Sequence, residues 1–148
     1  QAYLAYQYLH GLGTDADPQK AAYWYQAAAE KGHPDAQAEL GQLLLSGTGV
    51  EKDYEQAAYW FSKSAAQGNT TAEGKLGYLY LAGLGVTKDR AKAYAWLKLA
   101  TVHDNKQAEK ELARLQPVLS EQEKKDGESL FNQLKSQKPV LEADEPEI

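Results

Sequence analysis

Three kinds of residue in this sequence could carry chemistry, and each fails a test of spacing or context. Gly-x-Gly pairs start at Gly11, Gly47 and Gly83, but a phosphate-binding loop also needs a preceding strand and a third glycine that opens a helix. The three histidines occupy unrelated positions of the repeat described below, with no second metal ligand at helical spacing. No serine or threonine has a nucleophile-elbow context, and the carboxylates are typical of solvated helix faces. We therefore expect no catalytic residue, no metal and no cofactor.

The composition is that of a folded, water-exposed chain, with 43% hydrophobic and 25% charged residues among 148. The net charge is −5, and four acidic residues in the last seven leave only −1 on the remainder. This balance argues against a nucleic-acid or anionic-membrane partner. The absence of cysteine excludes disulfides and thiolate chemistry. No apolar run approaches the roughly 18–20 residues of a membrane span, so we expect no membrane insertion.

The elements that must position any site recur at a period of 36 residues. The tryptophans Trp24, Trp60 and Trp96 have this spacing, and the glycine pairs keep the same register. Self-similarity at this period is typical of proteins built from stacked repeats. The sequence begins without methionine inside a helical pattern, so we expect it to be an excised or processed piece of a longer chain.

Each repeat is expected to be a pair of helices joined by a glycine turn. Glycine ends the first helix, and an aspartate such as Asp53 caps the second. Helices of about 12–15 residues are marginal alone in water, so stacking on neighbours must stabilise them. The expected helices cover residues 1–10, 18–31, 34–46 and 54–67, then 70–82 with Asn69 or Thr70 as cap, a helix after Asp89 to about 103, and 106–116.

The fourth repeat begins like the others and then departs from the pattern. Pro117 ends its first helix, and Ser120 with Glu123 forms a capping-box pattern before a charged helix over residues 120–136. Leu130, Phe131 and Leu134 are expected to pack, while Glu121, Lys124, Lys125 and Glu128 stay in water. The expected domain is thus a helical array over 1–136 with units at about 1–32, 33–68, 69–104 and a partial 105–116, followed by an acidic tail over 137–148 without regular structure.

The middle repeat carries five short motifs: Leu40-Gly41, Gly47-Thr48-Gly49-Val50, Asp53-Tyr54-Glu55-Gln56-Ala57, Trp60-Phe61 and Ala65-Ala66-Gln67-Gly68. They resemble the Sel-one-like repeat (SLR) family, a branch of the tetratricopeptide-like α-solenoids, and the resemblance covers residues 1 to about 116. It implies an all-α fold, a right-handed α/α superhelix of three to four helical hairpins with a C-terminal capping helix. It also implies a groove lined by the first helix of each pair, and a non-catalytic scaffold or adaptor role in bacterial signalling, envelope or host-interaction systems. A periplasmic or envelope location follows from the resemblance alone, and the cytoplasm stays open.

The side of each first helix that faces away from its packing side is the candidate binding surface. At about 100° per residue, Gln42 and Leu45 lie roughly opposite Ala36 and Leu40. A face that meets only water has no need of leucine and tyrosine in successive repeats, so we predict that it binds a protein or peptide partner. The predicted groove residues are Tyr6, Gln42, Leu45, Tyr78, Leu81, Lys110 and Arg114. The alternative is that the leucines pack between first helices and that the basic pair is plain surface charge.

Two further hypotheses concern the ends of this surface. Lys110 and Arg114 favour a partner with an acidic end, because two cations four residues apart on a helix lie on one side. The acidic tail around residues 142–148 offers such an end, so it could fill a groove of its own chain or of a second copy and cause self-association. Besides the binding module, two roles remain open: a spacer that positions a neighbouring domain, and part of an enzyme whose active residues lie elsewhere.

Overall fold

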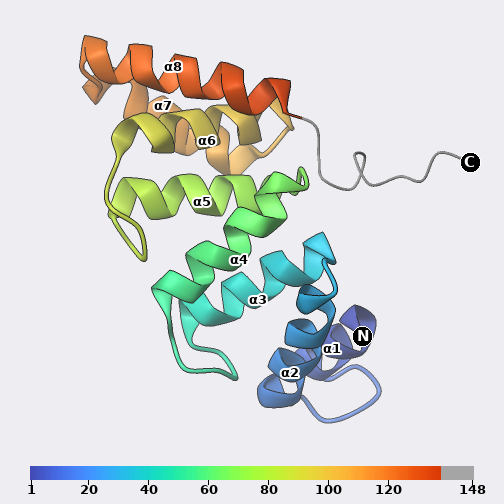
Figure 1. Ribbon diagram of the computed structural model, residues 1–148. Coiled ribbons are helices and arrows are strands. Elements are labelled where there is room, and N and C mark those ends of the chain that lie inside the picture. Colours follow the sequence, from blue (N-terminus) through green and yellow to red (C-terminus); the bar gives the residue numbers. More distant parts are fainter. Residues whose placement is uncertain (138–148) are drawn as a thin grey trace, which may run out of the picture.

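The computed structural model describes residues 1–137, and all regular structure in that range is helical (Figure 1). The expected all-α array of helical hairpins is confirmed, and the helix bounds agree with the expected ones to within one residue. Pairs α1–α2, α3–α4 and α5–α6 pack in chain order, while both α7 and α8 pack on α6. The elements are α1 (Ala2–His10), α2 (Pro18–Glu30), α3 (Pro34–Ser46), α4 (Tyr54–Ala66), α5 (Thr70–Ala82), α6 (Arg90–Val102), α7 (Lys106–Leu115), the 3-10 turn η1 (Gln116–Val118) and α8 (Glu121–Ser136).

Close approach between the two helices of a hairpin depends on a glycine in the first. A Cβ added at Gly41 would lie 2.9 Å from the ring of Phe61, and one at Gly77 would lie 2.8 Å from Leu97. Phe61 and Leu97 lie directly against the backbone of α3 and α5, so a methyl group at either glycine would have no room. Both side chains are buried, at 0% and 1% exposure. The same contact therefore closes the second and third hairpins.

The turns of the second and third hairpins also touch the preceding repeat. Gly85 has φ +72°, and a Cβ there would collide with the backbone carbonyl of Tyr54 at the start of α4. Gly49 makes the equivalent approach to Pro18 at the start of α2. Gly13, with φ +74°, has no neighbour within 4 Å of such a Cβ. The turn glycines thus serve the backbone reversal and, in two repeats, the docking of one repeat on the previous one.

A polar pair also joins the first helix of a hairpin to the end of its second helix. Gln67 donates from Nε2 to Oε1 of Gln37 at 2.8 Å. One repeat later, His103 Nδ1 lies 2.8 Å from Oε1 of Glu73. Glu73 is 1% exposed, so it is not part of a solvated helix face as the sequence suggested. Burial raises the pKa of Glu73, and the bond to His103 opposes that rise.

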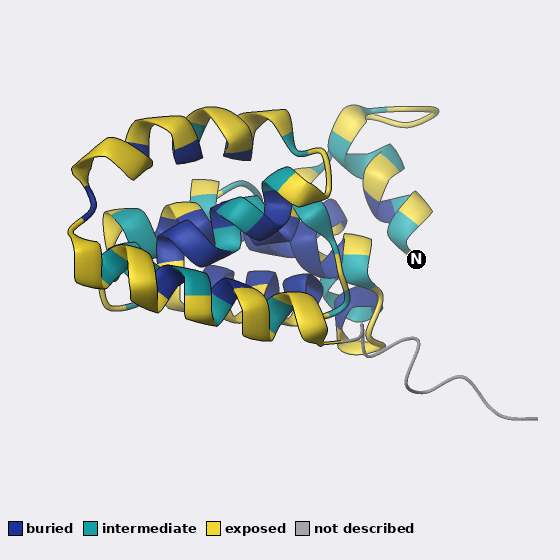
Figure 2. Cartoon of the chain, turned by 90° about the horizontal axis from the view of Figure 1, so that it is seen from above, coloured by how far each residue is buried: buried dark blue, intermediate teal, exposed yellow. Residues whose placement is uncertain are grey.

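Helix α8 ends the array by packing on α6. Arg90 donates from Nε and Nη2 to the two carboxylate oxygens of Glu123 at 2.9 and 2.8 Å, and Glu123 also closes the expected capping box with Ser120. Glu128 does not stay in water as expected, because it accepts from Tyr94 and from Lys98 Nζ across the interface. Phe131 is buried there as predicted, whereas the outward side of α8 is exposed (Figure 2).

None of the helices over residues 1–137 is long and apolar enough to span a bilayer. The prediction for the acidic tail falls on residues 138–148, which lie outside the described part of the chain.

Alanine at Gly85 is expected to cost more stability than alanine at Gly13. Both positions force a left-handed backbone, which costs a non-glycine residue roughly 1–2 kcal/mol. At Gly85 the collision with Tyr54 adds roughly 1–3 kcal/mol of overpacking. Urea unfolding of Gly85→Ala and Gly13→Ala, followed by circular dichroism, measures the difference. Equal losses would mean that the turn does not dock on the preceding repeat.

The Arg90–Glu123 pair is expected to lose its stabilising effect in acid. The bonds from Arg90 and the Ser120 backbone lower the pKa of Glu123 from 4.5 to about 2. A lowered folded-state pKa gives stability that is present above pH 4.5 and is lost as the pH falls toward 2. Glu123→Gln should therefore be less stable than wild type at pH 7, with the difference shrinking over that window. The control is Glu121→Gln, whose carboxylate is 89% exposed and should track wild type at every pH.

Glu73 predicts the opposite pH dependence. Since its folded-state pKa is raised, the folded chain keeps this proton after the unfolded chain has released it, and stability falls as the pH rises above about 4.5. Glu73→Gln, which imitates Gln37, should gain stability over wild type between acidic and neutral pH. The control is Glu109→Gln, which changes the equivalent but exposed residue of α7. A difference in stability between Glu73→Gln and wild type that stays constant over this pH range would contradict the raised pKa of Glu73.

Candidate functional site

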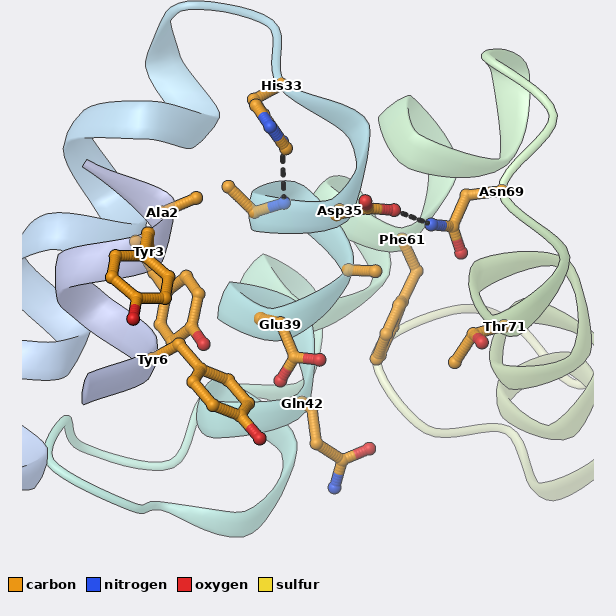
Figure 3. A pocket seen from close by; sticks show the side chains of 13 residues that line it. Ala2, Tyr3, Tyr6, His33, Asp35, Glu39, Gln42, Phe61, Asn69 and Thr71 are labelled. Carbon is orange, nitrogen blue, oxygen red and sulfur yellow. Dashed lines mark hydrogen bonds between the residues drawn. The ribbon is translucent and has the colours of Figure 1, made fainter. Parts of the chain in front are cut away.

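A first hollow of about 410 Å³ lies between α1, α3 and the start of α5 (Figure 3). Tyrosines of α1 stand on one side of α3, and Phe61, Asn69 and Thr71 stand on the other, with Glu39 and Gln42 between them. The lining residues are Ala2, Tyr3, Tyr6, Tyr25, His33, Asp35, Ala36, Ala38, Glu39, Gln42, Phe61, Asn69 and Thr71. This hollow is therefore aromatic on one wall and polar along its middle.

A second hollow of about 590 Å³ follows between the end of α3, α5 and α7. Thr71 lines both hollows, so they adjoin on one side of the array. The lining residues of the second are Leu45, Thr71, Gly74, Lys75, Tyr78, Leu97, Asn105, Gln107, Ala108 and Glu111. Together the two hollows form a groove along the first helices, and we use the term groove for these two sets of residues.

The two hollows are the same structural position in successive repeats. A shift of 36 residues takes Gln42 to Tyr78 and the buried floor residue Phe61 to Leu97. It also takes the small residue Ala38 to Gly74, over which the side chain of Asn105 lies. The contact that closes each hairpin thus supplies the floor of each hollow. The groove is a consequence of stacking and needs no special element.

The N-caps of the first helices lie at the edge of the groove. His33 accepts the Ala36 N–H on Nδ1 at 3.2 Å, and Asn69 accepts the Ala72 N–H at 2.9 Å. The Asn69 side chain also donates to Asp35 at 2.9 Å. Asn69, and not Thr70, is therefore the cap that the sequence left open, and His33 is an equivalent cap that the sequence analysis missed. The 36-residue spacing between the two could have revealed it.

The structure places four of the seven predicted groove residues in the hollows. Tyr6 and Gln42 line the first, and Leu45 and Tyr78 line the second. Leu81 is half-buried against the core formed by α6 and α7, which agrees with the alternative that it packs internally.

The other two predicted residues, Lys110 and Arg114, line neither hollow. Each hollow needs a following first helix as a wall, but η1 and α8 follow α7 within residues 1–137, and α8 packs on α6. Arg114 lies 3.7 Å from Glu111 on its own helix. That the basic pair meets an acidic partner stays a prediction.

Sequence reasoning missed several charged or aromatic residues of the groove. Four of them, Tyr3, Glu39, Lys75 and Glu111, occupy one repeat position, next to the predicted strip. Burial raises the pKa of Glu39, His10 opposes that rise, and Asp35 adds to it. Burial together with the charge of Glu39 and nearby Tyr6 raises the pKa of Tyr25 to about 12. Partial burial is thus the main cause of both shifts, and the carboxylates of the first hollow add to it.

Comparison with known proteins identifies the repeat. The description "Sel1 repeat" matches residues 1–33, 34–69 and 71–101. A Sel1 repeat protein from Oxalobacter formigenes is 35% identical with a TM-score of 0.72, and the match covers 75% of this chain and 46% of that one. A protective antigen of uropathogenic Escherichia coli strains, described as displaying an SLR fold, is 32% identical with a TM-score of 0.86, covering 99% and 32%. Cysteine-rich protein B of Helicobacter pylori is 28% identical with a TM-score of 0.57, covering 61% and 68%.

The chain spans about half the length of the first of these structures and a third of the second. No curated protein matches it. The three matched repeats extend over more than half of the sequence and coincide with the three hairpins of the structure. The chain belongs to the Sel1 repeat family.

Proposed function

We propose that this chain is a non-catalytic interaction module that binds an extended peptide segment of a partner protein in the groove. Sel1 repeats are generally protein–protein interaction modules. The observation that carries the proposal is the exposure of equivalent residues in the groove. Tyr6 is 46% exposed in the first hollow, and Tyr78 is 45% exposed in the second. Exposed aromatic rings in a hollow are typical anchors for a partner.

The construction of the groove supports the same role. Its floor is rigid, because Phe61 and Leu97 are buried against helix backbone. A preformed site costs little ordering on binding, so more of the contact energy appears as affinity. Two adjoining hollows suit a segment long enough to place one side chain in each. Helical supports of this kind hold anchors more accurately than loops do.

The spacer alternative receives less support. If the chain served only as a spacer, its own side chains would be expected to fill the space along the first helices. Instead the two hollows retain volumes of about 410 and 590 Å³ beside half-exposed tyrosines. Apolar surface left open in this way is typical of a surface that a partner covers.

Peptides selected from a random display library on the wild-type chain test the proposal. We expect Tyr6→Ala/Tyr78→Ala to bind the selected peptides at least about tenfold more weakly, because aromatic anchors dominate such interfaces. The matched control is Tyr23→Ala/Tyr59→Ala, which removes exposed tyrosines of α2 and α4, 36 residues apart, that line neither hollow. Affinities come from fluorescence anisotropy, and circular dichroism checks folding. Failure to select any peptide, or equal weakening by the two double variants, would refute groove binding.

A further inference from the structure

The two hollows differ at one repeat position in the sign of its charge. Glu39 lines the first hollow, and Lys75 occupies the equivalent place in the second. The first hollow contains a second carboxylate, Asp35, where the second contains Thr71. The second hollow balances Lys75 with Glu111. The groove therefore carries a net negative charge at its α1–α3 end and none at its α5–α7 end.

The carboxylate of Glu39 lacks a cationic partner. Within residues 1–137, no lysine, arginine or histidine lies within ion-pair distance of it. The two histidines near this hollow are occupied otherwise. His33 uses Nδ1 as an acceptor for the α3 cap, and His10 Nδ1 lies 3.0 Å from the Tyr6 carbonyl. Asp35 accepts only from the neutral amide of Asn69. Neither carboxylate forms an ion pair within residues 1–137, and the only opposing charge that acts on Glu39 in that range is that of His10.

Aromatic rings face the carboxylate of Glu39. Tyr3 and Tyr6 of α1 face Glu39 across the first hollow, as Figure 3 shows, and Tyr25 lines the same space. Tyr3 is 73% exposed, so its ring is free to cover a guest. A ring face attracts a cation, and a carboxylate at the same place supplies the hydrogen-bond acceptors. The pKa of Glu39 is raised mainly by partial burial of its carboxylate, and the nearby Asp35 adds to the rise while His10 opposes it.

We propose that the first hollow receives the arginine or lysine side chain of the bound peptide, held between the tyrosines of α1 and the carboxylates of Glu39 and Asp35. The inference rests on the proposed function, since it assigns one residue of the peptide that the groove binds. It also orients that peptide. The basic residue lies at the α1–α3 end, and the segment continues past Thr71 into the second hollow, where Tyr78 and Leu45 offer an apolar surface above the buried Leu97.

The difference in charge between the two hollows favours one direction of the bound peptide. A basic side chain in the second hollow would meet Lys75 as well as Glu111, whereas in the first it meets two carboxylates. Complementary charge thus favours the peptide that places its basic residue at the α1–α3 end over the reversed one. One position of the repeat thus sets the direction of the partner.

The test uses peptides selected on the wild-type chain. We expect the selected set to share an arginine or lysine at one position. Replacing this residue by citrulline, which keeps the shape of arginine without its charge, should lower affinity about tenfold, as should Glu39→Gln. The two changes together should cost little more than either alone, because they remove the same contact.

Two protein variants complete the design. Glu55→Gln makes the same change in net charge on an exposed residue of α4 outside the hollows, and it should leave affinity unchanged. Glu39→Lys, which copies Lys75, should select peptides without the basic residue. If Glu39→Gln and Glu55→Gln lowered the affinity for the peptides equally, the inference would be overturned. The effect of Glu39 would then be only a long-range attraction between net charges.

The outcomes separate this inference from the proposed function. Peptides that require Tyr6 and Tyr78 but share no basic residue would refute the cation site and leave groove binding intact. Peptides that share a basic residue and respond to Glu39→Gln and to Tyr6→Ala, with no response to Tyr78→Ala, would support the cation site and contradict a groove that spans both hollows. The absence of any selected peptide would overturn both.

Discussion

The structure depends on the contact of a side chain of each second helix with a glycine of the first. Phe61 against Gly41 and Leu97 against Gly77 bring the two helix axes together at a distance that any larger residue would prevent. The same side chains then form the buried floor of the two hollows. A contact needed for folding therefore fixes the depth and shape of the groove, which makes the binding surface as rigid as the core.

The architecture could be predicted from the sequence because its signals are local and repeated. Asp53 and its equivalents each cap a helix, and the Ser120–Glu123 capping box marks the start of α8 as expected. Such signals act within a few residues, and repetition at 36 residues confirms each one in another unit. Tyr6, Gln42, Leu45 and Tyr78 were found by the same means, since helical periodicity assigns them to one face.

The predictions that failed share a physical cause. The periodicity of one helix does not show which other element packs against each of its faces. Lys110 and Arg114 have the correct position on α7, but no further first helix within the described residues closes a hollow beside them. Glu73 and Glu128 were assigned to water because carboxylates on a helix are usually solvated, and each bonds a residue about thirty positions away. Contacts at that separation depend on packing geometry, which one helix cannot reveal.

Comparison of equivalent positions separates the framework of this chain from its recognition surface. Positions that close the hairpins keep their physical character: Gly41 matches Gly77, and the buried floor residues Phe61 and Leu97 are both apolar. The position represented by Glu39 and Lys75 reverses its charge although its backbone setting is the same. Packing places no demand on that residue, because it points into open space. A repeat array can therefore vary such positions without cost to its core, and differences among repeats at these positions are where the preference for one partner can be encoded.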